Sequence, residues 1–178
     1  MLVMTLLVLF GYSCKHAFGN IYDLMNFESS IVCVVPLVIL NNGTNNTSTI
    51  YANSTSAKVS VNTNATSLTY SYSLNIVNNN ASLWEVRLEH FNYTNINFAN
   101  ATIILHDNVT SSQQITLSGG NISQTNQYYN LTSNSTIHIG IQNLVENSSG
   151  TTLLHVYLKI KAPDTTTYTL YIITFEFT

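Results

Sequence analysis

The residues whose types and spacing point most clearly to chemistry are asparagines in the motif Asn-x-Ser/Thr, where x is not proline. This motif is the acceptor for N-linked glycans. It occurs 13 times, about twice as often as the composition predicts, and always between residues 42 and 147. The candidate glycan acceptors are Asn42, Asn45, Asn46, Asn53, Asn64, Asn80, Asn92, Asn100, Asn108, Asn121, Asn130, Asn134 and Asn147. A bulky, hydrated glycan cannot occupy a core, so the middle of the chain is expected to face outward. Both ends are expected to be buried or to take part in assembly.

No other motif predicts catalysis or a bound cofactor. The five histidines do not have the HxH or HExxH spacing of a metal site; they are His16, His90, His106, His138 and His155. The sequence has no GxSxG nucleophile motif and no Gly-rich phosphate loop, and its few aspartates and glycines exclude a repeated calcium-binding array. We therefore expect a protein that is not an enzyme, without a metal ion or small-molecule substrate, whose only non-protein groups are covalent glycans.

The composition indicates a single domain with an uncharged polar surface, and the sequons indicate that it is extracellular. The chain has 178 residues, of which 45% are hydrophobic and only 7% charged, whereas charged residues are about 25% of an ordinary soluble domain. Solubility must come from the 24 Asn and 42 Ser and Thr residues. The net charge of −3 with only five Lys and Arg argues against nucleic-acid binding, which requires clustered cations.

Alternation of apolar and polar residues with a period of two predicts β-strands from residue 58 onward. Strands are expected near 58–62, 67–76, 84–89, 91–98, 101–106, 113–118, 126–131, 135–142, 153–161 and 168–177, with most sequons in the turns between them. Glu85, Arg87 and Glu89 should lie on the outer face of one strand. The last strand is apolar on both faces, so it should lie inside a packed sheet or be covered. Eight to ten short strands predict an all-β, Ig-like or jelly-roll-like sandwich over residues 31–178.

Residues 1–30 form an apolar N-terminal arm, for which the sequence leaves three interpretations. Met1–Phe10 could be the core of a secretory signal cleaved after Ala17, although no positive charge is present at its start. It could be a membrane anchor, or the start of a type IV pilin-like helix, although it is about half of the ~20 residues needed to span a bilayer. It could also be an assembly strand that pairs with a neighbouring copy. The residues that would share one face of that strand are Leu2, Met4, Leu6, Val8 and Phe10.

The two cysteines distinguish these interpretations. If Cys14 and Cys33 are both retained outside the cell, they can form a disulfide that ties the arm to the first strand. A loop of about 20 residues would contribute ~3 kcal/mol in the chain-entropy model. Cleavage after Ala17 would instead leave Cys33 alone.

The C-terminal sequence VYLKIKAPDTTTYTLYIITFEF resembles the closing hairpin of Ig-like and TasA-like secreted β domains. Together with the apolar arm and the dense sequons, it makes the chain similar to the thread and bundling-pilus subunits of archaea. That resemblance implies donor-strand complementation into a homopolymeric, glycosylated filament at the cell surface, for adhesion or contact with other cells. A virion coat or turret protein, an S-layer component and a monomeric adhesin are the alternatives.

Overall fold

The computed structural model describes residues 38–51 and 54–178. In the described part of the chain every regular element is a β-strand. The strands are β1 (Val38–Asn42), β2 (Ser48–Ile50), β3 (Ser56–Val61), β4 (Leu68–Asn78), β5 (Trp84–Thr94), β6 (Ala99–His106), β7 (Ser111–Ser118), β8 (Asn121–Gln124), β9 (Tyr129–Leu131), β10 (Thr136–Glu146), β11 (Thr152–Lys161) and β12 (Thr169–Phe177).

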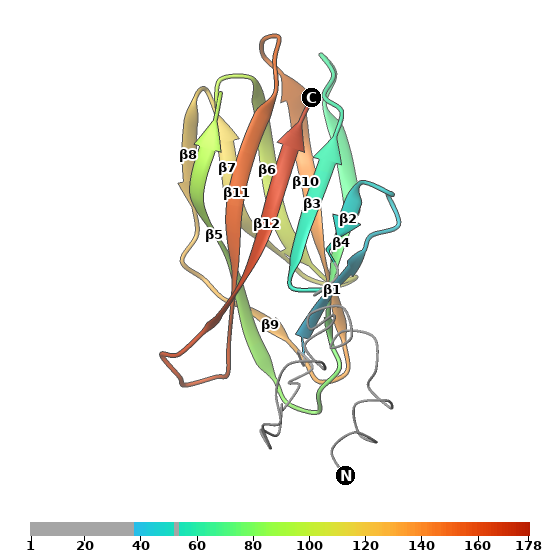
Figure 1. The fold of residues 1–178 in the computed structure, drawn as a ribbon, viewed down its shortest axis with the longest axis vertical. Helices are drawn as coiled ribbons and strands as arrows, with labels where there is room; N and C mark the ends of the chain where they lie inside the picture. The colour runs from blue at the N-terminus through green and yellow to red at the C-terminus, as the bar shows by residue number, and fades with distance from the viewer. Residues whose placement is uncertain (1–37, 52–53) are drawn as a thin grey trace, which may run out of the picture. The chain divides into compact units, whose positions relative to one another are not determined.

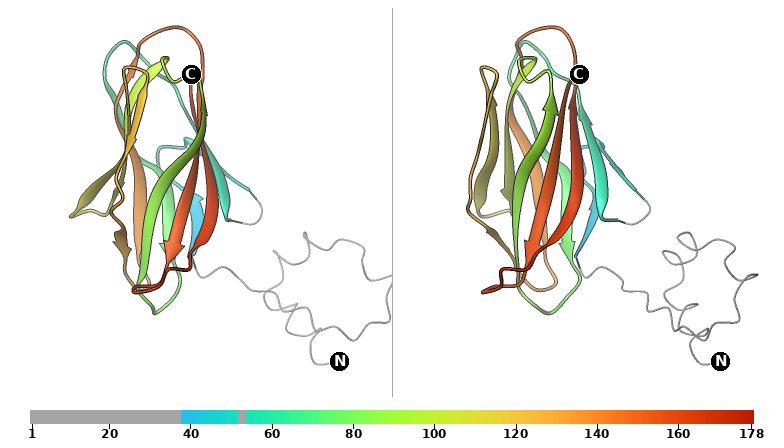
Figure 2. Two further views of the ribbon diagram at one scale, coloured as in Figure 1. Left: turned by 90° about the vertical axis from the view of Figure 1, so that its left-hand side faces the viewer. Right: turned by 60° about the vertical axis from the view of Figure 1, so that its left-hand side comes forward.

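These strands form two six-stranded sheets that pack face to face (Figures 1 and 2). Sheet A has the order β1-β4-β10-β6-β7-β8, and sheet B has the order β2-β3-β12-β11-β5-β9. β12 pairs in parallel with β3, and the other pairs of described strands are antiparallel. The all-β sandwich predicted from the alternation of apolar residues is confirmed.

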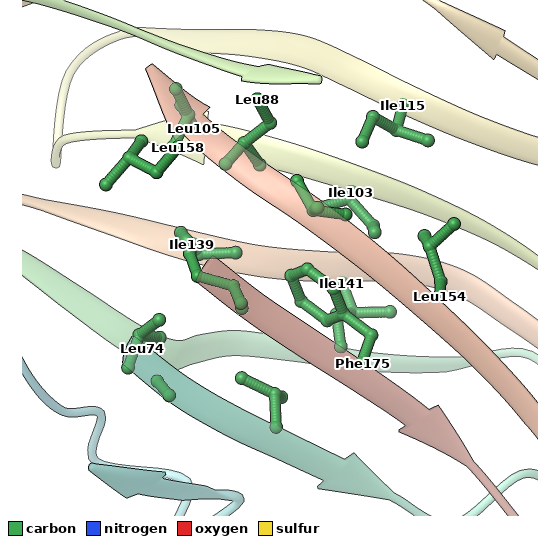
Figure 3. Packing of buried hydrophobic residues seen from close by; sticks show 14 of the residues in the cluster. Leu74, Leu88, Ile103, Leu105, Ile115, Ile139, Ile141, Leu154, Leu158 and Phe175 are labelled. Atoms are coloured by element: carbon green, nitrogen blue, oxygen red, sulfur yellow. The ribbon is translucent and has the colours of Figure 1, made fainter. Parts of the chain in front are cut away.

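The core lies between the two sheets and is built from the inward-facing half of each strand. β11 shows the pattern most clearly, because buried and half-buried residues alternate along its whole length. Side chains from both sheets meet in Figure 3, including Leu74 and Ile139 of sheet A and Leu158 and Phe175 of sheet B. Fully burying one such side chain contributes about 1.5–3 kcal/mol. The core of the described unit is therefore assembled from strands within residues 38–178.

The final strand, β12, lies inside sheet B between β3 and β11, as its two apolar faces predicted. Its inward residues are buried, with Tyr171 at 5% and Phe175 at 0% exposure. The outward residues Leu170 and Ile172 remain 43% and 46% exposed. Packing within the sandwich thus accounts for one apolar face of β12 and leaves the other open.

Side chains satisfy the backbone where the strand pairing of β5 ends. β9 pairs with residues 84–86 of β5 only. Beyond that point the Gln114 side chain accepts a hydrogen bond from the Leu88 amide (3.1 Å), and Gln124 accepts one from the His90 amide (3.2 Å). Gln114 is itself 1% exposed. These contacts occupy donors that would otherwise be open to another strand.

On the other side of the sandwich, a tyrosine links sheet B to sheet A. The hydroxyl of Tyr171 on β12 donates a hydrogen bond to the carbonyl of Val38 on β1. Burial raises the pKa of Tyr171, which keeps the hydroxyl protonated as a donor. The amide of Leu40 also bonds to the Ser54 carbonyl (2.9 Å), which links β1 to the turn before β3.

Several strand boundaries differ from the sequence-based prediction. The described residues form twelve strands rather than eight to ten. The predicted strand at 91–98 was wrong, because β5 continues to Thr94 and residues 95–98 lie between β5 and β6. The predicted strand at 126–131 is shorter, since β9 covers only Tyr129–Leu131, and β8 was not predicted. Both β8 and β9 are too short to show a period.

Candidate glycan-bearing and assembly surface

The sequon asparagines of the described residues are all at least partly accessible. Of the thirteen, Asn53 lies outside the described residues; Asn80 and Asn100 are half-buried and the other ten are exposed. The expectation that sequons fall mostly in turns was only partly correct, because Asn42, Asn92, Asn100, Asn121 and Asn130 belong to strands. Accessible side chains are compatible with all twelve described sites as glycan acceptors.

The side-chain amide nitrogen, which carries the glycan, is already engaged at two of these sites. The Nδ2 of Asn100 donates to Oδ1 of Asn147 (3.3 Å), so two candidate acceptors bond to each other. The Nδ2 of Asn121 donates to the Gly119 carbonyl (3.3 Å). A glycan at either site would have to replace a hydrogen bond.

The sequons are distributed unevenly over the two sheets. β2, β3, β12 and β11 are adjacent in sheet B and contain no sequon asparagine, whereas Asn92 and Asn130 lie on β5 and β9 at the other end of the strand order. The exposed pair Leu170 and Ile172 lies on the outer face of this sequon-free region. The largest exposed apolar side chains of the C-terminal strand therefore lie where no glycan is expected.

The same outer face of sheet B carries the four cations of the described residues, and each has a carboxylate partner. Glu89 bonds to both Arg87 (2.5 Å) and Lys159 (2.7 Å). The hydrogen bond from Lys159 is the largest cause that holds the pKa of Glu89 below its ordinary value. Glu85, Arg87 and Glu89 do share an outer face, as predicted; Glu85 and Glu89 pair with lysines of β11, and Arg87 pairs with Glu89 on β5 itself.

Two further ion pairs complete this arrangement. Lys161 lies 2.5 Å from Glu85, and Lys58 lies 2.9 Å from Glu176. Hydrogen bonds from Lys58 and Ser60 lower the pKa of Glu176. Because each cation on this face already has a carboxylate partner within the subunit, a partner that docks there does not have to supply one.

Aromatic rings border these charges. The Tyr128 ring lies under the Arg87 guanidinium (5.1 Å to the ring centroid) and under the Lys161 ammonium (4.8 Å). Lys159 lies over Tyr168 at 4.7 Å. Cation–π contacts of this length contribute about 0.5–1 kcal/mol at exposed sites. They hold the long cationic side chains against the sheet.

Two of the histidines, which do not have metal-site spacing in the sequence, come together on the outer face of sheet A. His106 on β6 is paired with His138 on β10, their ring centroids are 5.3 Å apart, and both rings contact Tyr72. His106 reaches over Gly140 to the Ser71 carbonyl (2.6 Å), and a Cβ at Gly140 would lie 3.3 Å from its Nε2. Alternation alone could not predict this pair, because it depends on which strands are neighbours.

The four histidines of the described residues do not form a metal site with other ligands. Within residues 38–51 and 54–178, no three His, Cys, Asp or Glu side chains are placed to hold a metal ion. His90 and His155 lie on sheet B, where they bond to Gln124 and Thr174. His16 lies outside the described residues.

The His138 environment predicts a specific pH dependence of stability. Burial, followed by the charge of His106, lowers the pKa of His138 below its ordinary value of 6.5, and the nearby Asp107 partly opposes this; Tyr72 and Asn75 are its uncharged neighbours. As the pH falls, His138 therefore binds a proton at a higher pH in the unfolded chain than in the folded protein. The contribution of neutral His138 to the free energy of unfolding is complete above about pH 6.5 and declines below it. We expect the melting temperature of the wild type to fall more between pH 7 and pH 5 than that of His138→Gln. Equal pH dependence in calorimetry would contradict this assignment.

The remaining sequence-based site residues lie outside the described residues. They are Cys14 and Cys33, predicted to form a disulfide, and the assembly-strand residues Leu2, Met4, Leu6, Val8 and Phe10. No helix that could cross a membrane is found in the part of the chain that the structure describes.

Neither the protein-family models nor the curated proteins include a match to this sequence. Solved structures with a similar fold include a PapD-like domain of human CEP192, with 8% identity, a TM-score of 0.44, and coverage of 88% of this chain and 96% of that one. The CooA pilin subunit from enterotoxigenic Escherichia coli has 10% identity and a TM-score of 0.40, with coverage of 80% and 98%. CfaE, the adhesive subunit of CFA/I fimbria of the same bacterium, has 11% identity and a TM-score of 0.38, with coverage of 67% and 45%.

Proposed function

We propose that this protein is a structural, non-catalytic subunit of an N-glycosylated extracellular filament, a thread or pilus of the archaeal kind, with no cofactor other than its glycans. The observation that carries the proposal is the exposed apolar pair Leu170 and Ile172 on the sequon-free strands of sheet B. An apolar surface without glycans, on a chain that otherwise relies on polar residues for solubility, is a surface for protein contact.

The apolar arm of a second copy is the partner that this proposal assigns. Residues 1–14 contain no charged residue, and each described cation on sheet B already has a carboxylate partner within the subunit. An extended segment of that kind adds to a sheet through its main chain and through alternate side chains. Because the described core is closed by its own strands, the arm is expected to add at an edge or on the outer face of the next subunit rather than to fill a missing core strand.

A test of this contact exchanges the exposed pair for charge. Leu170→Lys with Ile172→Lys should abolish filaments in negative-stain images, because a charged side chain opposes burial of an apolar arm. Both positions are on the surface, so the circular dichroism spectrum and the melting temperature should change little. Val109→Lys is the matched control, since Val109 is 91% exposed and its substitution retains the Asn108 sequon. Filaments of normal length from the double variant would contradict the proposed contact surface.

Images of the native material also distinguish the alternatives. A virion or S-layer component should show closed or planar symmetry instead of a head-to-tail fibre. A monomeric adhesin should present an aromatic cluster that is free of glycans. Two of the exposed aromatic residues, Phe91 and Tyr93, flank a sequon asparagine, which argues against a glycan-free aromatic cluster at that place.

A further inference from the structure

A bulge in β5 brings a candidate glycan acceptor and an aromatic side chain to the same face of sheet B. Val156 on β11 is paired with His90, and the preceding residue, His155, is paired with Asn92. Phe91 is therefore the extra residue of a bulge. In a regular strand without the bulge, Phe91 and Asn92 would point to opposite faces, because successive side chains alternate.

Phe91 is part of an aromatic stack on the outer face. Its ring lies parallel to Tyr157 on β11, with a centroid distance of 4.0 Å and an interplanar angle of 16°. The His155 ring is 5.9 Å away. Phe91 is nevertheless 43% exposed. One ring face is covered by Tyr157, so the opposite face is the one that is open to solvent.

The Asn92 side chain is arranged so that its nitrogen is accessible. Its Oδ1 accepts a hydrogen bond from the Tyr93 amide (2.9 Å), and the residue is exposed. The Nδ2 atom is thus left for modification, unlike the engaged Nδ2 atoms of Asn100 and Asn121. The sequon Asn92-Tyr93-Thr94 and the open ring face of Phe91 are consecutive on one surface.

We propose that Phe91, backed by Tyr157, is the docking platform for the first sugar of the glycan on Asn92. This inference rests on the proposed glycosylation. In that step Asn92 Nδ2 forms a bond to the anomeric carbon of a polyprenyl-phosphate-linked oligosaccharide, the bond from that carbon to the phosphate oxygen breaks, and the amide loses one proton. The C–H groups on one face of a pyranose then pack on the electron-rich face of Phe91.

This docking also determines where the glycan lies. The open face of Phe91 turns away from β11, because Tyr157 of β11 covers the other face. A sugar held there lies toward the β9 side of β5. The exposed pair Leu170 and Ile172 lies on β12, on the opposite side of β11. The platform would therefore keep the glycan of Asn92 off the surface proposed for assembly.

The test compares the stabilising effect of the glycan with and without the aromatic ring. The full-length chain is produced in an N-glycosylating host, and occupancy of Asn92 is verified by peptide mass spectrometry. We expect the melting temperature of the occupied protein to exceed that of Asn92→Gln by about 2–4 °C, a shift that a single favourable contact gives in a domain of this size. In the Phe91→Leu background this difference should vanish, whereas it should persist with Tyr93→Ser. Asn64→Gln, in the loop after β3, controls for loss of a glycan elsewhere.

The outcomes separate this inference from the proposed function. Sugar protons shifted upfield by the Phe91 ring in the NMR spectrum of the wild type would support the platform. An equal glycan effect in the wild type and Phe91→Leu, or an unoccupied Asn92 beside other occupied sequons, would overturn the platform and leave the filament proposal standing. A stacked glycan on a protein that never forms filaments would overturn the filament and leave the platform.

Discussion

Removal of residues 1–13 is expected to abolish filament formation and to leave the β-sandwich folded. The deleted segment contains the apolar run Met1–Phe10, which the proposal assigns to contact with the next subunit. The described core is built from residues 38–178, so the truncated chain retains the strands that bury it. Negative-stain microscopy and pelleting should report the loss of polymer, while the far-ultraviolet circular dichroism spectrum should remain that of a β protein. Filaments from the truncated chain would exclude the arm as the assembly segment.

Single substitutions can show whether the arm acts as an extended strand. If one face of the strand inserts, Leu6→Asp should prevent polymerisation, whereas Thr5→Asp on the opposite face should have a much smaller effect. The intact mass of the native protein gives an independent check. A chain that begins at Phe18 would show that Met1–Ala17 is a signal, and a retained arm should carry the disulfide between Cys14 and Cys33.

Alternation of residues was sufficient to predict the sandwich and the direction of most side chains. Leu74 and Ile76 on β4 and Leu154 and Leu158 on β11 are buried as expected. Alternation with a period of two indicates which face of the sheet a residue occupies, because the side chains that face inward are removed from water and are therefore apolar. The outer location of Glu85 and Glu89 follows from the same rule.

The same pattern carries no information about which strands are neighbours. Nothing in the sequence predicts that β12 pairs in parallel with β3, or that His106 and His138 are adjacent across β6 and β10. A bulge adds one residue to a strand and interrupts the alternation, but it does not change which types of residue the strand contains. For that reason the extra residue Phe91 led to the incorrect division of β5. The site that depends on this bulge, Phe91 beside Asn92, could be found only from the register.

On sheet B, the exposed apolar pair of β12 and the candidate glycan acceptors lie on different strands. Leu170 and Ile172 would favour nonspecific association on an unmodified surface. β11 and β12 contain no sequon, while candidate acceptors occur at Asn92 and Asn130 on the strands beyond them. Glycans at these positions would border the contact surface on its β5 side without covering it. A specific contact would then be allowed, and sideways association of subunits would be hindered.

Phe175→Ala should be among the most destabilising substitutions in the domain. Phe175 is fully buried, and its ring is stacked near that of Phe177 at a centroid distance of 6.4 Å. Removing a buried aromatic side chain leaves a cavity and lowers the free energy of unfolding by about 3–5 kcal/mol. For a domain of this size, the melting temperature should fall by roughly 6–20 °C. Leu170→Ala is the matched control on the outer face of the same strand, and it should change the free energy of unfolding by about 0.5 kcal/mol or less. If the two variants melted together in calorimetry, the assignment of the inner and outer faces of β12 would be wrong, and with it the surface proposed for assembly.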